Sequence, residues 1–115
     1  MCYAAYSKGT TALLAAILAT ADSLGVRDEL YQQWDMDDTK FSEQVDRRVT
    51  RVAAKAWRFE GEMHEIASTF QKAGLPGGFH ESAAEIYRRM AAARGESEAP
   101  SLDEILAALR NQDPT

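Results

Sequence analysis

The sequence predicts an all-α domain, and two observations lead to this prediction. Apolar residues recur at steps of three and four along most of the 115-residue chain, which is the period of helices that bury one face. Strand patterns are missing, because β-branched and polar residues alternate nowhere for more than a few positions. A chain of this length fits one domain, so we expect residues 1–115 to form a single domain of about five helices.

The first expected helix runs from Met1 to about Leu24 and is apolar on nearly every side. It ends at Gly25, a residue type that often terminates helices, and no Ser, Thr, Asp or Asn precedes it to cap its first turn. An all-round apolar helix must be covered on most sides, so we expect it to pack centrally. We therefore expect the chain to be a piece of a larger protein that begins inside a helix.

Two further helices are expected before the glycine-rich turn at residues 74–78. A short helix covers Val26 to about Trp34, and Asp38 or Thr39 can cap the segment that follows. That segment, from about Thr39 to Ala73, is long enough for a bend or a second helix, which we place near Val49. Its apolar stripe consists of Phe41, Val45, Val49, Val52, Ala56, Phe59, Met63, Ile66 and Phe70.

The last two helices follow this turn. One is expected from about Phe79 to Arg94, and a shorter one from Leu102 to about Leu109. Ser101 and Glu104 have the spacing of a capping box, in which each side chain bonds the backbone N–H of the other residue. The buried faces are predicted to contain Ala83, Ala84, Ile86, Tyr87, Met90, Ile105, Leu106 and Leu109.

Composition narrows the class of protein. The formal net charge of -5 argues against a nucleic-acid partner, because phosphate binding needs a surplus of Lys and Arg on one face. Cys2 is the single cysteine, so an internal disulfide is excluded, and we expect a reducing, cytoplasmic location with Cys2 as a small core residue. The unbroken apolar run from Ala12 to Ala19 is too short to span a bilayer, so no membrane association is expected.

Two clusters of polar side chains could carry chemistry. Glu60 and His64 share a helix face and could begin a metal site, although a solvated face is favoured because a site needs three or four ligands. A basic stretch could receive a phosphate or carboxylate, or could pair with nearby glutamates on a wet surface, which we favour. Its members on one side are Arg47, Arg51, Lys55 and Arg58. Trp57 is expected to be a packing anchor.

Lys8 is the single charge inside the apolar region of the first helix. It could reach out to solvent, or it could be a cation held in a cleft for an anionic ligand, and the residues leave both readings open. Tyr3 and Tyr6 flank it, and a buried tyrosine needs a hydroxyl partner, so one side of this helix end is expected to be polar.

Four blocks carry a resemblance to a known family. In order along the chain they read MCYAAYSKGTTAL (1–13), AKAWRFEGEM (54–63), GLPGGFHE (74–81) and AEIYRR (84–89). Together they resemble the C-terminal helical domain of 6-phosphogluconate-dehydrogenase-like, NAD(P)-dependent oxidoreductases, which belong to the wider β-hydroxyacid dehydrogenase group. The likeness extends over nearly the whole chain.

The resemblance implies a division of labour with a Rossmann domain that is absent from this chain. That N-terminal domain would bind NAD or NADP, while this domain would shape the substrate cleft and form a homodimer. The catalytic lysine would fall just before Met1. Tyr3-Ala4 replaces a substrate-holding His-Asn pair, Lys8 replaces a phosphate-contacting tyrosine, and Gly61-Glu62 replaces a Lys-Asp pair.

Two hypotheses of function follow. In the first, the chain is the substrate-binding and dimerisation domain of an NAD(P)-dependent oxidoreductase acting on a small hydroxy acid. It would be inactive alone and hold no catalytic residue, cofactor-binding residue or metal, with Tyr3, Ser7 and Lys8 lining the substrate cleft. In the second, it is a stand-alone helical interaction or dimerisation module whose first helix docks on a partner or on a second copy.

Overall fold

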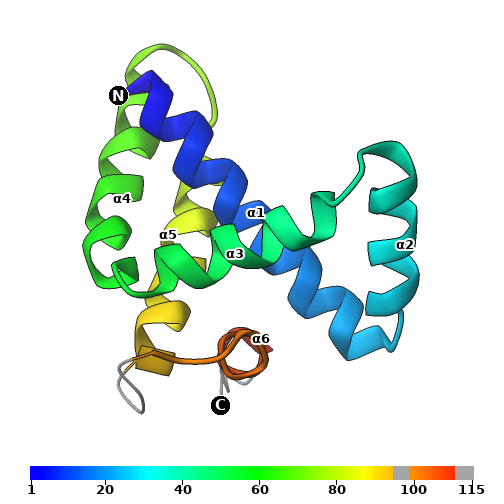
Figure 1. Cartoon of the computed structure of the whole chain (residues 1–115). Helices are drawn as coiled ribbons and strands as arrows, with labels where there is room; N and C mark the ends of the chain where they lie inside the picture. Colours follow the sequence, from blue (N-terminus) through cyan, green and yellow to red (C-terminus); the bar gives the residue numbers. More distant parts are fainter. Residues whose placement is uncertain (95–98, 111–115) are drawn as a thin grey trace.

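The computed structural model describes residues 1–94 and 99–110, which form six helices and contain no strand (Figure 1). The predicted all-α class is therefore confirmed. The helices are α1 (Cys2–Leu24), α2 (Arg27–Asp37), α3 (Phe41–Ala53), α4 (Ala56–Lys72), α5 (Gly78–Arg94) and α6 (Leu102–Arg110).

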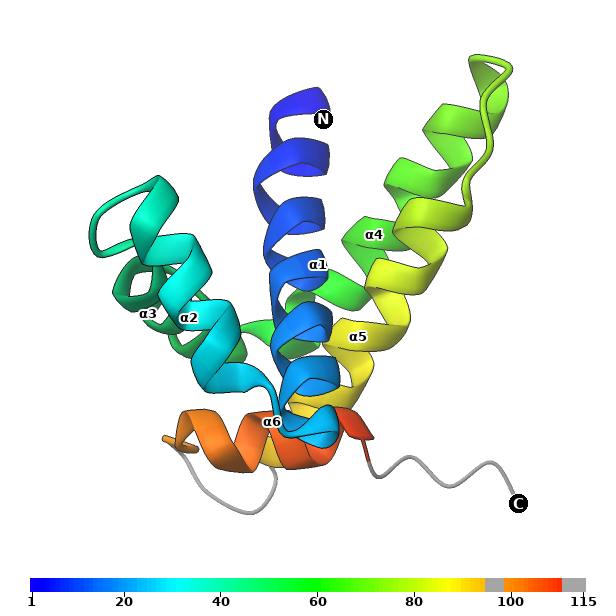
Figure 2. The same ribbon diagram turned by 90° about the vertical axis from the view of Figure 1, so that its right-hand side faces the viewer.

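The central place predicted for the first helix is confirmed, because α1 contacts each of the other five helices. Figure 2 shows α1 standing between two arms, one made of α2 and α3 and the other of α4 and α5, with α6 lying across its C-terminal end. Gly25 ends α1 in the left-handed conformation, with φ 75°, so the predicted stop is also confirmed.

The expected long segment after residue 38 is two helices, and the break lies at Ala54 and Lys55 instead of near Val49. A continuous helix over residues 39–73 would be about 50 Å long. The whole domain extends only 40 Å in its longest direction, so the chain has to turn. The turn directs α4 along α5, while α3 crosses the centre of the molecule (Figure 1). The predicted apolar stripe is nevertheless buried or half-buried throughout both helices.

The described residues cover α1 on one face and leave another face open. Its buried residues are Thr11, Ala12, Ala15, Leu18, Ala19 and Ala21. Leu13 and Leu24, by contrast, are exposed although both are large and apolar. The helix is apolar on nearly every side, but the described residues bury only one of its faces.

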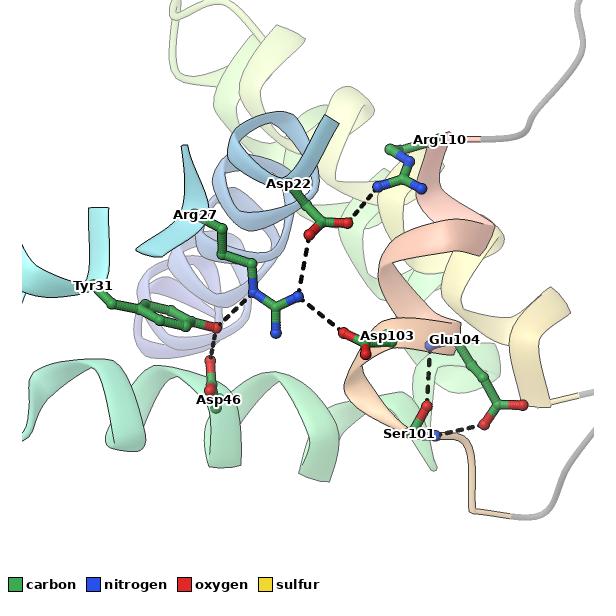
Figure 3. Close-up of polar contacts among 8 residues, drawn as sticks. All are labelled: Asp22, Arg27, Tyr31, Asp46, Ser101, Asp103, Glu104 and Arg110. Carbon is green, nitrogen blue, oxygen red and sulfur yellow. Dashed lines mark hydrogen bonds and ion pairs between the residues drawn. The ribbon is translucent and has the colours of Figure 1, made fainter. Parts of the chain in front are cut away.

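Charged side chains fasten the C-terminal end of α1 to its neighbours (Figure 3). The Asp22 carboxylate accepts hydrogen bonds from Arg27 Nη1 at 3.3 Å and from Arg110 Nη1 at 2.5 Å. Arg27 Nη1 also donates to Asp103 Oδ1 at 2.9 Å, which ties α2 to the start of α6. The bonds from Arg110 and Arg27 hold the pKa of Asp22 below its ordinary value of 3.8.

Tyr31 extends this network to α3. Its hydroxyl accepts a bond from Arg27 Nε at 2.9 Å and donates to Asp46 Oδ1 at 2.8 Å (Figure 3). Burial raises the pKa of Tyr31 to about 12, so its hydroxyl remains a donor at neutral pH. We call the whole set, Asp22, Arg27, Tyr31, Asp46, Asp103 and Arg110, the charged clasp.

The capping predictions have different outcomes. The box at the start of α6 is confirmed, because Glu104 N–H donates to Ser101 Oγ at 3.1 Å and Ser101 N–H donates to Glu104 Oε1 at 2.8 Å. At the start of α3, neither of the expected side chains provides the cap. Asp35 does so from within α2, accepting from the N–H and the hydroxyl of Ser42 at 2.9 and 2.8 Å.

Substitutions of two glycines should have opposite effects on stability. A Cβ on Gly9 would lie 2.7 Å from His80 Nε2, whereas one on Gly61 meets nothing within 4 Å. We expect Gly9→Ala to lower the free energy of unfolding by about 1 kcal/mol, since overpacking outweighs the gain in helix propensity. Gly61→Ala should raise it by about 0.5–1 kcal/mol. Urea unfolding of both variants measures this, and equal signs would contradict the packing described.

Acid should weaken the charged clasp. Because the pKa of Asp22 is lowered in the folded chain, its contribution is present above pH 3.8 and is lost as pH falls further. Asp22→Asn should therefore lower the melting temperature at pH 7 and lower it less and less below pH 3.8. Thermal melts at several pH values test this, with exposed Glu65→Gln as the control. A deficit that stays constant with pH would refute the role of the charge.

Candidate functional site

Three side chains from other helices donate hydrogen bonds to main-chain oxygens near the N-terminal end of α1. The donors are His80 Nε2 at 3.0 Å, Arg48 Nη2 at 2.9 Å and the Tyr87 hydroxyl at 2.6 Å. Their acceptors are, in the same order, the carbonyl oxygens of Ala5, Ser7 and Lys8. We call these six residues the carbonyl clamp. It fixes α1 to α3 and α5 where the predicted site residues lie.

Arg48 makes the largest number of contacts in the clamp. Besides the Ser7 carbonyl, it donates from Nε to Thr11 Oγ1 at 2.6 Å and from Nη2 to Thr10 Oγ1 at 2.5 Å. The Thr11 hydroxyl donates in turn to the Ser7 carbonyl at 2.7 Å. A guanidinium presents several donors in a fixed plane, which suits a set of oxygens clustered on one helical turn.

The two clamp side chains from α5 are both buried. Tyr87 has no exposed surface, and burial raises the pKa of its phenol well above the ordinary range. Its ring packs edge-to-face on Phe59 with the centroids 5.4 Å apart. His80 packs edge-on against Phe70 at 4.8 Å. Close approach of His80 to α1 depends on the absence of a side chain at Gly9.

Lys8 points towards α4, where it meets a carboxylate and an aromatic ring. Its Nζ lies 3.5 Å from Glu62 Oε1 and 4.9 Å from the centroid of the Phe59 ring. The side chains of Lys8 and Glu62 are 29% and 37% exposed, so solvent and small solutes can reach both. The arrangement presents one cation and one anion at a fixed place, and an anionic ligand could exchange with Glu62 for the ammonium group.

The structure brings together two of the three predicted site residues. Ser7 and Lys8 belong to the same clamped turn, Ser7 through its carbonyl oxygen. Tyr3 is exposed and packs against the exposed ring of Tyr6, with the centroids 6.2 Å apart. The two tyrosines are therefore not buried as that expectation assumed, and the polar side of this helix end carries Lys8, Glu62 and Arg48 instead.

Sequence reasoning missed Arg48, Glu62, His80 and Tyr87 as parts of this site. A signal for two of them was present. Arg48 lies between Val45 and Val49 of the apolar stripe, and Glu62 lies between Phe59 and Met63. Both positions are next to a buried residue, at the edge of the buried face. Polar residues there can turn inward.

The other candidate clusters do not converge on a ligand site in the described residues. His64 lies between Glu60 Oε2 at 4.0 Å and Glu81 Oε2 at 3.1 Å, and the described residues contain no group of three or more side chains that could hold a metal ion. The basic stretch is exposed, with a shallow hollow of about 490 Å³ between its first two arginines. Glu62, one of the glutamates near the basic stretch, pairs with Lys8 instead.

Two expected core residues lie on the surface. Trp57 is 61% exposed and is not the packing anchor that was predicted, because its position on α4 lies on the side opposite the buried residues Phe59 and Met63. Cys2 is exposed as well, because it lies on the uncovered face of α1.

The described residues contain no phosphate-binding loop of the kind that nicotinamide-binding domains use. Phosphate-binding loops of nicotinamide-binding domains follow a strand, and no strand occurs in the part of the chain that the structure describes. The glycine-rich turn at residues 74–78 joins two helices instead. Among those same residues, no helix has the length and hydropathy needed to cross a membrane.

The fold and the clamp define the class of protein as a six-helix, all-α domain built around a central helix. Residues 21–90 match the family described as Domain of unknown function (DUF1932), and the chain belongs to this family. The match includes Arg48, Glu62 and Tyr87 but not Lys8. No curated protein and no solved structure matches the chain.

Single substitutions of two neighbouring arginines should show that the one in the clamp stabilises the fold and the one on the surface does not. Arg48→Met removes three hydrogen bonds and leaves their acceptors without this donor, so we expect a loss of about 2–3 kcal/mol in the free energy of unfolding. Arg47→Met removes the same charge from an exposed position and should change stability by less than about 0.5 kcal/mol. Denaturant unfolding compares the two, and similar losses would contradict the clamp.

Proposed function

We propose that this chain is the substrate-binding and dimerisation domain of an NAD(P)-dependent oxidoreductase that acts on a small hydroxy acid. The resemblance implies that the cofactor would be bound by a Rossmann domain outside these 115 residues. The matched family has no described function. The proposal rests in addition on the four sequence blocks that resemble the helical domain of 6-phosphogluconate-dehydrogenase-like enzymes.

The observation that carries the proposal is the placement of Lys8. Three clamp donors fix the turn that bears it, and its ammonium group stays accessible beside Glu62. A carboxylate of a hydroxy acid fits such a cation, because charge-assisted hydrogen bonds to an ammonium group are short and strong. Ser7 and Tyr3 follow Lys8 towards the N-terminal end of α1, where a substrate would extend.

The chain's own residues would bind and orient the substrate, and they would not transfer a hydride. The nicotinamide supplies the hydride chemistry when it is bound by its own domain. Holding the substrate carboxylate at Lys8 would set the direction of the carbon that reacts, which is the contribution of a positioning group to rate. The isolated chain is therefore expected to have no turnover.

A second candidate is a helical interaction module without catalysis. The exposed apolar residues of α1, Leu13 and Leu24 among them, favour this function, because patches of this kind mark interaction sites. The two candidates differ in whether Lys8 binds a ligand, and the experiment below decides between them.

Binding of small hydroxy acids should depend on Lys8. We expect glycerate, lactate and 3-hydroxybutyrate, added to the full chain, to shift backbone amide NMR signals around Lys8 and Glu62. Lys8→Met should weaken binding at least about tenfold, the value of one charge-assisted hydrogen bond. Lys40→Met, which removes an exposed lysine from the start of α3, should leave it unchanged.

Two results would count against the proposal. Binding that is equal in wild type and Lys8→Met, or no binding by any hydroxy acid, would favour the interaction module. Turnover of a hydroxy acid by the chain with NAD or NADP and no other protein would contradict the division between two domains.

A further inference from the structure

Positive charge is concentrated where α3 turns into α4, at the outer edge of the molecule (Figure 1). The segment from Arg47 to Arg58 contains five of the 13 Lys and Arg residues and no Asp or Glu, so the net charge of -5 arises entirely outside it. Arg48 points inward to the carbonyl clamp, whereas the other four cations and one aromatic ring are exposed. We call this exposed set, Arg47, Arg51, Lys55, Trp57 and Arg58, the basic corner.

The cations of the basic corner are not neutralised by this chain. None of the four forms an ion pair with a side chain in the part of the chain that the structure describes. Arg27, Arg89 and Arg110, by contrast, each pair with a carboxylate. The glutamates of α4 are directed elsewhere, since Glu62 meets Lys8. The basic corner is therefore free to pair with carboxylates from outside.

Helix stability does not account for this arrangement. Arg51 is placed favourably in the last turn of α3, but Arg47 lies one turn before it, and like charges at that spacing destabilise a helix. Arg58 lies in the first turn of α4, which contains no acidic residue, although the positive end of the helix dipole favours anions there. An anionic partner would relieve both sources of repulsion.

Trp57 adds an apolar contact point among these cations. It lies between Lys55 and Arg58 in the chain and is 61% exposed. Tryptophan and arginine are the residue types that contribute most often to the binding energy of protein interfaces. The hollow between Arg47 and Arg51 is shallow, so the basic corner offers a surface for a macromolecule and no enclosed pocket for a small one.

Length and charge favour a short acidic segment of a protein as the occupant. The path from Arg47 to Lys55 covers about 12 Å along α3 and the turn that follows. An extended peptide advances about 3.3 Å per residue, so about four to six residues would cover the basic corner. A nucleic-acid strand carries a charge at every phosphate, and the acidic remainder of the chain would repel the part that extends beyond the corner.

We propose that the basic corner docks an acidic segment of a partner protein. The segment has about five residues, of which at least three are Asp or Glu and one is aromatic or aliphatic. Its carboxylates pair with the cations of the corner, and its apolar side chain packs on Trp57. No residue of the corner belongs to the carbonyl clamp or to the Lys8–Glu62 pair, so the inference goes beyond the proposed function and is tested separately from it.

Fluorescence anisotropy at low salt tests the docking. The probe is a fluorescein-labelled peptide of glutamates around one central phenylalanine, and the same peptide with glutamines is its control. Arg51→Glu in the full chain should weaken binding at least about fivefold, because an ion pair is lost and a like charge is added. Lys72→Glu makes the same change of charge at an exposed position at the other end of α4, and it should leave binding within about twofold.

A third variant tests the aromatic contact. Trp57→Ala should weaken binding of the phenylalanine peptide about threefold and should have a smaller effect on a glutamate peptide with serine at its centre. Equal losses for the two peptides would overturn the packing on Trp57. Far-UV circular dichroism checks that all three variants remain helical.

The remaining outcomes decide whether the partner is an acidic segment. Binding of the glutamate peptide that Arg51→Glu weakens and Lys72→Glu does not would support the docking. No binding at about 0.5 mM chain, equal binding of the glutamine peptide, or equal weakening by both charge variants would overturn it. Tighter binding of a labelled oligothymidylate of about eight nucleotides, lost in Arg51→Glu, would overturn the protein segment in favour of nucleic acid.

Discussion

The fold depends on side chains of α3 and α5 that bond to the main chain of α1. A carbonyl oxygen has two lone pairs, and the helix itself uses only one of them. The clamp donors use this remaining capacity at the carbonyl oxygens of Ala5, Ser7 and Lys8, and the Ser7 oxygen also accepts from the Thr11 hydroxyl. Small residues such as Gly9 let the donors come this close, and Lys8 meets Glu62 because its own backbone is already held.

The two ends of α1 are fastened by different physical means. Near its start, the buried side chains of His80 and Tyr87 bond to main-chain oxygens, where a lost partner is costly and added salt has little effect. Near its end, the charged clasp joins carboxylates and guanidinium groups close to the surface. Ionic strength and acid act mainly on the second end, so conditions that loosen α2 and α6 need not disturb the turn carrying Lys8.

Helix positions could be predicted well because local signals define them. The apolar stripe and the stops at Gly25 and at residues 74–78 fixed most boundaries, and the Ser101–Glu104 box was confirmed as predicted. The break at Ala54 could not be placed, because the apolar period continues through it and no Gly or Pro marks it.

The candidate site was only partly predictable for a related reason. Every residue has a backbone carbonyl, so the sequence does not show which carbonyl oxygen a given side chain will bond. Tyr87 was placed in the buried face from its spacing, but its bond to the Lys8 carbonyl has no sequence signature. Lys8 stood out as a lone charge and Glu62 lay at the edge of the apolar stripe, but nothing in the sequence indicated that the two side chains meet.

Because the clamp side chains bond to backbone oxygens of α1, these hydrogen bonds do not depend on the side chains of the residues that are bonded. Different side chains at Tyr3, Ser7 or Lys8 would leave the helix seated where it is, provided Gly9 stays small. Residues displayed by this turn can therefore be exchanged, in related chains or by design, without a change in how α1 packs on α3 and α5.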